Sequence, residues 1–282
     1  MEKISAFEEL SSVKDNKVIV DTEKSLLNNS TVVFNGKNNI LVIEDGATIS
    51  NSKIIFNGEN SVVYIGKSKH ACLLNINIYN ESAVYLGCDS YYNGTVNIIA
   101  SERQNVIIGN DCLFSFGIWI RTADPHLIYS AETKKRLNYS KSVFIGDHVW
   151  IGQNAMILKG CEFGSGSILG GGSVASGKKI PSNASFAGNP AKFIQGNIFY
   201  SSLCVHAYDE AKTKESEICN TDKWIYSSSG STINMSALDF DLKSLKTAEE
   251  KLSLIKKNLI DNTDKNRFFK PADNKKSIFR WK

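Results

Sequence analysis

The sequence has 282 residues, of which 42% are hydrophobic, and its formal net charge is +4. A chain of this length buries a sizeable core as one or two domains, and so small a charge does not indicate a nucleic-acid partner. The N-terminal stretch is charged and no window approaches 18 apolar residues, so the sequence predicts a cytoplasmic protein without an export signal or a transmembrane segment.

The first half of the chain repeats an apolar segment every 21 or 22 residues. The aligned aliphatic residues of four such segments are Ile43, Ile65, Leu86 and Ile108. This repeat corresponds to one coil of a β-prism, with about 18 residues in its three sides and a small insertion at a corner. We therefore expect the prism to begin at about residue 30, after a separate N-terminal segment, residues 1–29.

From Ile108 the repeat shortens to six residues. Large apolar residues, which we expect to point into the prism, recur six apart. They are Ile108, Phe114 and Ile120, and then Ile145, Ile151, Ile157, Phe163 and Leu169. A helix repeats its apolar positions at three and four residues and a strand at two, whereas six fits a short strand followed by a turn. Three such hexads form one coil of a triangular prism. Ile120 and Ile145 are 25 residues apart, one more than four hexads, so a loop at about 121–142 interrupts this mainly β fold.

The repeat stops after "NPAKFIQG", and residues 196–282 form a C-terminal extension. Leucines and other apolar residues then recur at steps of three and four, which predicts an amphipathic helix at about 237–260. We expect its apolar face to pack on the prism or on a neighbouring subunit. Peripheral association with a membrane is a weaker alternative, because acidic residues share the polar face. The sequence assigns no role to the basic tail that follows.

Three motifs in the second half of the chain resemble the hexapeptide-repeat acyltransferases: "IGDHVWIG" (145–152), "ILGGGSVAS" (168–176) and "IPSNASFAGNPAK" (180–192). The resemblance implies a left-handed parallel β-helix, a homotrimer with active sites at the subunit interfaces, and acetyl-CoA as co-substrate without a metal. The combination "ADPHLIY…LNYSKSVFIGDHVWIG" is most similar to O-acetyltransferases of bacterial surface polysaccharides, including those that acetylate sialic acid. It implies a glycan acceptor, sialic acid or polysialic acid, in a capsule or lipooligosaccharide.

Acetyl transfer to a hydroxyl group needs a general base, and histidine suits that role near neutral pH. His126 lies at the start of the inserted loop, where the family carries its catalytic histidine, and is the predicted base. Asp124 either orients the His126 imidazole or forms a turn before Pro125. By resemblance, Trp150 lies beside the acetyl end of CoA. His148 is expected on an outer face or an interface and is the second choice of base.

The match to the family implies a set of CoA contacts. The residues along the pantetheine arm are Gln153, Gly171 and Ser176, and those facing the phosphates are Lys178 and Lys192. One residue more than the usual spacing separates Ser173 from Pro181. The choice between Lys178 and Lys179 therefore stays open.

Aromatic and cationic residues also gather around the proposed base in the sequence. They are Trp119, Arg121, Tyr129 and Lys135. Aromatic faces suit a sugar ring, and Arg binds a carboxylate through two parallel hydrogen bonds. These four residues predict an acidic sugar as acceptor, with solvated loop residues as the alternative.

Other functions fit the sequence less well. A zinc enzyme on a β-prism, of the γ-carbonic anhydrase kind, needs three histidine ligands, two of them close in sequence. The four histidines here are 56, 22 and 58 residues apart. A non-catalytic scaffold or binding protein remains an alternative, as does acetyl transfer to a neutral sugar, an amino-sugar nucleotide or serine.

Overall fold

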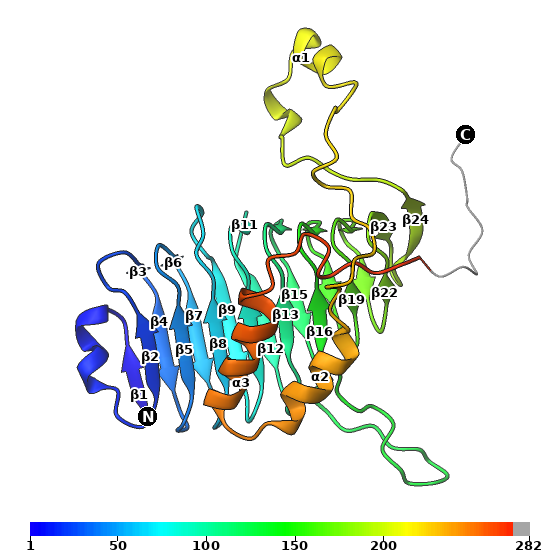
Figure 1. Cartoon of the computed structure of the whole chain (residues 1–282). Helices are drawn as coiled ribbons and strands as arrows, with labels where there is room; N and C mark the ends of the chain where they lie inside the picture. The colour runs from blue at the N-terminus through cyan, green and yellow to red at the C-terminus, as the bar shows by residue number, and fades with distance from the viewer. Residues whose placement is uncertain (273–282) are drawn as a thin grey trace.

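The computed structural model describes residues 1–272, and the end of the basic tail, residues 273–282, lies outside the described residues. The chain winds into a triangular prism of stacked coils (Figure 1). Each coil passes through three walls, which we call wall B, wall C and wall A in chain order. The predicted prism is confirmed.

Walls A and B each contain eight strands. Wall A consists of β1 (Glu2–Ile4), β4 (Thr31–Phe34), β7 (Lys53–Phe56), β9 (Leu74–Ile78), β12 (Val96–Ala100), β15 (Trp119–Arg121), β18 (Met156–Ile157) and β21 (Val174–Ala175). Wall B consists of β2 (Lys17–Val20), β5 (Ile40–Ile43), β8 (Val62–Ile65), β10 (Ala83–Leu86), β13 (Val106–Ile108), β16 (Val143–Ile145), β19 (Glu162–Phe163) and β22 (Lys179–Ile180).

Wall C is built from shorter strands. A two-stranded part near the N-terminus contains β3 (Leu26–Asn28) and β6 (Thr48–Ser50). A six-stranded part contains β11 (Tyr91–Tyr92), β14 (Leu113–Phe114), β17 (Trp150–Ile151), β20 (Ile168–Leu169), β23 (Ala184–Ala187) and β24 (Lys192–Gly196). Pairing within the walls is parallel, except that β1 runs antiparallel to β4 and β24 runs antiparallel to β23.

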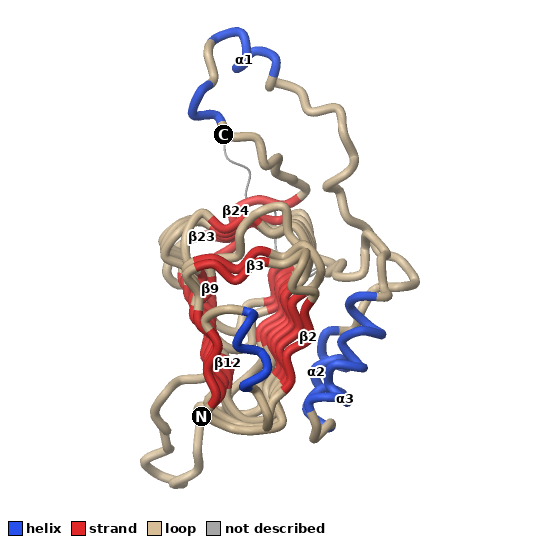
Figure 2. Tube along the Cα trace, turned by 90° about the vertical axis from the view of Figure 1, so that its left-hand side faces the viewer, coloured by secondary structure: helices blue, strands red, loops and turns tan. Residues whose placement is uncertain are grey.

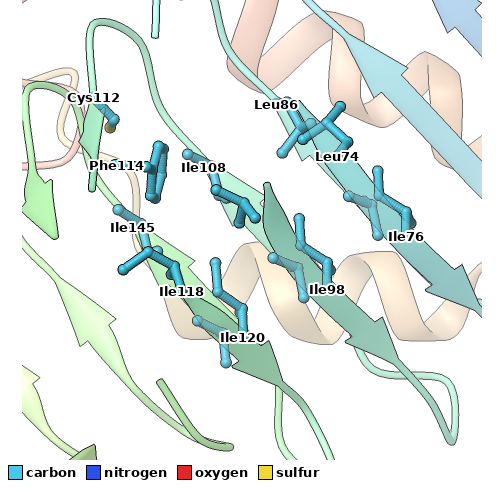
Figure 3. Packing of buried hydrophobic residues seen from close by; sticks show 14 of the residues in the cluster. Leu74, Ile76, Leu86, Ile98, Ile108, Cys112, Phe114, Ile118, Ile120 and Ile145 are labelled. Carbon is cyan, nitrogen blue, oxygen red and sulfur yellow. The ribbon is translucent and has the colours of Figure 1, made fainter. Parts of the chain in front are cut away.

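The repeated aliphatic residues form continuous stacks inside the prism. Ile43, Ile65, Leu86, Ile108 and Ile145 are register partners on successive strands of wall B. Each is at most 2% exposed, and Figure 3 shows Leu86, Ile108 and Ile145 among buried side chains of walls A and C. Ile145 continues the stack after the inserted loop, so the loop leaves the phase of the coils unchanged.

The first coil begins earlier than the sequence indicates. Val20 of β2 pairs with Ile43, 23 residues later, so residues 17–28 belong to the prism and not to a separate N-terminal segment. The 3₁₀-helix η1 (Phe7–Ser12) precedes this coil, and its partly buried Phe7 and Leu10 pack against the core. The boundary expected at residue 30 was wrong, because β2 and β3 already pair in parallel with the strands of the next coil.

Two helices of the C-terminal extension cover the outer face of wall B (Figure 2). They are α2 (Met235–Ser244) and α3 (Ala248–Ile255), and α3 continues into the π-helical turn Lys256–Ile260. The single helix expected at 237–260 is therefore interrupted. Thr247 and Glu250 form a capping box that starts α3. The break is at Thr247, since an N-cap residue has non-helical backbone angles. The expected packing of the apolar face on the prism is confirmed.

Between the prism and these helices the chain makes an excursion into solvent (Figure 1). It includes the 3₁₀ turn Val205–Ala207 and the short helix α1 (Glu210–Glu215). The chain then returns through Trp224 and Tyr226 to the corner between walls B and C. Among residues 1–272, no helix has the length and apolar character needed to cross a membrane.

Candidate active site

The inserted loop leaves the prism at the corner between walls A and B, after β15 and before β16 (Figure 1). Its two arms pair with each other: the Leu137 N–H donates to the Ile128 carbonyl at 2.8 Å, and Tyr129 and Arg136 form an antiparallel bridge. These arms are exposed and rich in large apolar side chains, namely Leu127, Ile128, Tyr129, Leu137 and Tyr139. The loop is thus an ordered projection from one corner.

Asn138 holds the part of the loop that carries His126. Its side-chain amide donates to the His126 carbonyl at 2.7 Å and to the Asp124 carboxylate at 3.1 Å, and its oxygen accepts from the Ile128 N–H at 2.9 Å. The side chain of His126 itself is exposed. Sequence reasoning assigned no role to Asn138, because two of its three partners are backbone groups that leave no pattern in the sequence.

The Asp124 carboxylate faces Lys159 in the next coil. Lys159 Nζ donates to Asp124 Oδ2, and this hydrogen bond is the main reason why the pKa of Asp124 is lowered. Among residues 1–272 the carboxylate has Lys159 and Asn138 as its side-chain partners. The expected contact with the His126 imidazole is therefore not formed, and Asp124 instead ties the base of the loop to the prism.

Trp150 lies on wall C, which is opposite the corner that carries the loop. Its side chain is 37% exposed and its ring is 5.7 Å from that of Tyr200, at an angle of 46°. In a triangular prism a corner and the facing wall are separated by the core. A single chain therefore does not bring His126 and Trp150 together.

His148 is buried, contrary to the expectation of an outer-face or interface residue. It is 2% exposed, and its ring lies between those of Tyr200, at 4.1 Å, and Trp224, at 3.5 Å, nearly parallel to both. The C-terminal extension folds back over this corner and covers it. A substrate hydroxyl group cannot reach His148 in this arrangement, which removes it as the second choice of base.

The residues matched to CoA contacts flank the last coils of wall A. Gln153 and Gly171 are exposed at the corner between walls C and A, and Ser176 is exposed at the corner between walls A and B. The outward side chains of Met156 and Val174 on wall A lie between these corners. Gly171 leaves the backbone uncovered, and a Cβ there would lie 3.2 Å from the Gln153 carbonyl oxygen. An apolar strip with open backbone at its edge fits an amide-bearing pantetheine arm.

The two candidate lysines differ in their ion pairs. Lys179 Nζ pairs with one oxygen of Glu162, whose other oxygen accepts from Lys270 Nζ at 2.7 Å. Lys178 has no side-chain partner within residues 1–272. Among the described residues the Lys178 ammonium is therefore unpaired, whereas that of Lys179 is paired with Glu162. Lys192, the first residue of β24, is exposed at the end of the prism.

The four candidate acceptor residues lie in two places, on β15 and on the inserted loop. Trp119 and Arg121 are outward neighbours on β15, with the guanidinium carbon 5.0 Å from the indole centroid. Tyr129 and Lys135 lie on opposite arms of the loop and are exposed. Arg136, the adjacent cation, is held by Glu102 and by the face of Tyr139.

Comparison with known proteins identifies related chains. No family model matches the sequence. A polysialic acid O-acetyltransferase of Neisseria meningitidis is 44% identical over 57 residues, 20% of this chain and 26% of that protein. One of Escherichia coli O1:K1 / APEC is 37% identical over 125 residues, 44% of this chain and 37% of that protein. The match thus spans less than two fifths of each of these two relatives.

Two solved structures match over more of their length. The polySia-specific acetyltransferase NeuO is 32% identical, with a TM-score of 0.61, over 71% of this chain and 93% of that chain. The polysialic acid O-acetyltransferase OatWY is 26% identical, with a TM-score of 0.57, over 71% and 96%. The chain therefore belongs to the hexapeptide-repeat acyltransferases with the left-handed β-helix fold, in the group that contains the polysialic acid O-acetyltransferases.

Proposed function

We propose that this chain transfers an acetyl group from acetyl-CoA to a hydroxyl group of sialic acid, alone or in polysialic acid, in a bacterial surface glycan. The observation that carries the proposal is the 32% identity with NeuO over 93% of that chain. The exposed His126 on an ordered loop, and the strip flanked by Gln153, Gly171 and Ser176, support it.

His126 is the proposed general base. Bound acetyl-CoA supplies an acyl group already activated as a thioester. The His126 imidazole accepts the proton of the sugar hydroxyl as that oxygen attacks, and returns a proton to the leaving sulfur. Asn138 and the Asp124–Lys159 pair hold the loop, and Lys178 and Lys192 bind phosphate groups. The residues that contact the acceptor are Trp119, Arg121, Tyr129 and Lys135.

Because His126 and Trp150 lie on opposite sides of one prism, the proposed site is completed between subunits of a homotrimer. The mass in solution should be close to three chains of 31.2 kDa. Co-expressed His126→Ala and Trp150→Ala chains should regain about a quarter of the wild-type rate, since random mixing leaves about one interface in four with both side chains intact. Mixed trimers without any recovered activity would place the site within one chain.

An acceptor screen tests the reaction itself. Thiol release from acetyl-CoA is followed with polysialic acid, sialylated oligosaccharides, neutral glycans, amino-sugar nucleotides and serine. We expect turnover with the sialylated acceptors. Turnover only with an amine would replace O-transfer by N-transfer, and a folded trimer that turns over none of them would favour the scaffold alternative.

Carboxyl-reduced sialosides test the recognition of an acidic sugar. We expect a lower kcat/KM for the reduced acceptor, and a smaller difference between the two acceptors after Arg121→Ala or Lys135→Ala. Equal kcat/KM for both acceptors in the native protein would rule out recognition of the carboxylate.

A further inference from the structure

Four aromatic rings connect the C-terminal extension to Trp150. In order, Trp224 stacks on His148 at 3.5 Å, His148 stacks on Tyr200 at 4.1 Å, and Tyr200 leans on Trp150 at 5.7 Å. We call these residues the ring stack. Two of them belong to the prism and two to the chain that follows it, so the extension reaches the candidate site through contacts between rings.

The two members that follow the prism, Tyr200 and Trp224, lie in segments that are held firmly. The Asn183 amide donates to the Trp224 carbonyl at 2.8 Å and to the Ile198 carbonyl at 2.9 Å, and its oxygen accepts from the Tyr226 N–H at 2.8 Å. Lys223 Nζ lies 4.1 Å from the Trp224 ring. One side chain of the prism thus fixes the segments both before and after the exposed excursion.

The inner members of the ring stack, His148 and Tyr200, are buried and sterically constrained. His148 Nε2 is 3.1 Å from the Tyr200 carbonyl oxygen, and Tyr200 is 7% exposed. Trp150 is 37% exposed and is the most exposed ring of the stack, whereas Trp224 is half-buried. An outward tryptophan on a flat strand has several accessible rotamers, and a fixed ring against one side excludes some of them.

We propose that the ring stack positions Trp150 for acetyl transfer, so that the C-terminal extension controls the rate without touching either substrate. Tyr200, His148 and Trp224 are then positioning residues that act through Trp150. The inference rests on the proposed function in placing Trp150 at the reacting groups.

Tyr200 offers a matched pair of variants. Its hydroxyl oxygen is buried and has no hydrogen-bond partner within residues 1–272, so Tyr200→Phe keeps the ring and should leave Trp150 in place. Tyr200→Leu removes the ring and leaves a smaller apolar side chain. Trp224→Phe and Trp224→Leu form the same kind of pair at the other end of the stack.

The first measurement needs no activity. A protein with Trp119→Phe, Trp224→Phe and Trp281→Phe retains Trp150 as its single tryptophan. In this background Tyr200→Leu should roughly double the acrylamide quenching constant of Trp150 and shift its emission to the red, because a covering ring is lost. Tyr200→Phe should change neither. Unchanged Trp150 emission after Tyr200→Leu, with the trimer mass and melting temperature retained, overturns the proposal.

The second measurement is a double-mutant cycle on kcat. Tyr200→Leu should lower kcat about three- to tenfold, the effect expected from the energy of one aromatic contact. In a Trp150→Phe background the same substitution should have a much smaller effect, since two residues that act through one contact are not additive. A fall by the same factor in both backgrounds would show a general structural role and overturn the proposal.

The two measurements separate this inference from the proposed function. If no acceptor is turned over, the function fails, while quenching still tests whether the ring stack holds Trp150. If Tyr200→Leu itself unfolds the corner, the single-tryptophan protein can be made with Trp224→Leu in place of Trp224→Phe. This variant tests the ring stack from its other end. There, unchanged quenching of Trp150 in a folded trimer contradicts the proposal.

Discussion

Arg267 anchors the C-terminal extension to the prism, and its removal should release the extension while the prism stays folded. The guanidinium is 3% exposed and donates to both oxygens of Asp147, at 2.9 and 2.8 Å. It also donates to the carbonyl oxygens of Leu259 and Asn262, at the end of the α3 segment. Phe268, the next residue, is fully buried against wall B.

Arg267→Met keeps an apolar side chain of similar length but leaves the Asp147 carboxylate without its counter-charge. Breaking a buried pair by removing one partner costs about 3–5 kcal/mol. The cost falls on docking of the extension, because the prism has its own core. Amide hydrogen exchange in α3 should therefore become about 10²- to 10⁴-fold faster, whereas exchange in wall A should be unchanged.

Two variants control this experiment. Lys265→Met, two residues earlier, loses an exposed contact with the Asp222 carbonyl and should change exchange little. Asp147→Asn added to Arg267→Met removes the unpaired charge, keeps an oxygen for the Asn110 N–H, and should recover part of the protection. Similar exchange rates in α3 for Arg267→Met and Lys265→Met would refute the reasoning.

His126→Ala should lower kcat by about 10²–10⁴ with CoA affinity nearly intact, and retention of most activity in this variant would exclude His126 as the base. Lys178→Ala should weaken CoA binding measured by calorimetry. Lys179→Ala should not, because Lys179 is paired with Glu162. Weaker CoA binding after Lys179→Ala and unchanged binding after Lys178→Ala would exchange the two roles. Burial lowers the pKa of Lys251 from 10.5 to about 8, so between pH 8 and 10.5 the unfolded chain binds more protons and the stability of the extension should rise with pH. The test is to measure amide exchange rates in α3 at both ends of this pH range, in the native protein and in Lys251→Met. If the ratio of the two proteins' rates is the same at both pH values, the reasoning is contradicted.

The prism could be predicted from the sequence because each coil repeats the same steric requirement. An inward residue must occur in phase with its neighbours, and Ile145 keeps the phase of Ile108 across the whole inserted loop. The interruption of the helix was also visible in principle. The residues from Thr247 to Glu250 have the spacing of a capping box, but the hydrophobic period continues through them and hides the break.

The candidate site was less accessible to sequence reasoning because its contacts are distant along the chain. The burial of His148 depends on Tyr200 and Trp224, which follow the last hexad. Asp124 was expected to orient His126, yet its partner Lys159 comes from the next coil of the prism. Side chains that meet at a corner are set by the stacking of coils, and local motifs do not contain that information.

The two antiparallel strands at the ends of walls A and C limit the length of the solenoid. A stack of parallel coils presents, at each end, backbone N–H and C=O groups to which another parallel coil can add. Here β1 reverses direction on β4, and β24 reverses direction on β23. A coil of a second molecule that approaches either edge meets a strand of the wrong polarity and cannot continue the stacks of inward residues. At these edges, strand direction itself protects the molecule against end-to-end growth into fibres.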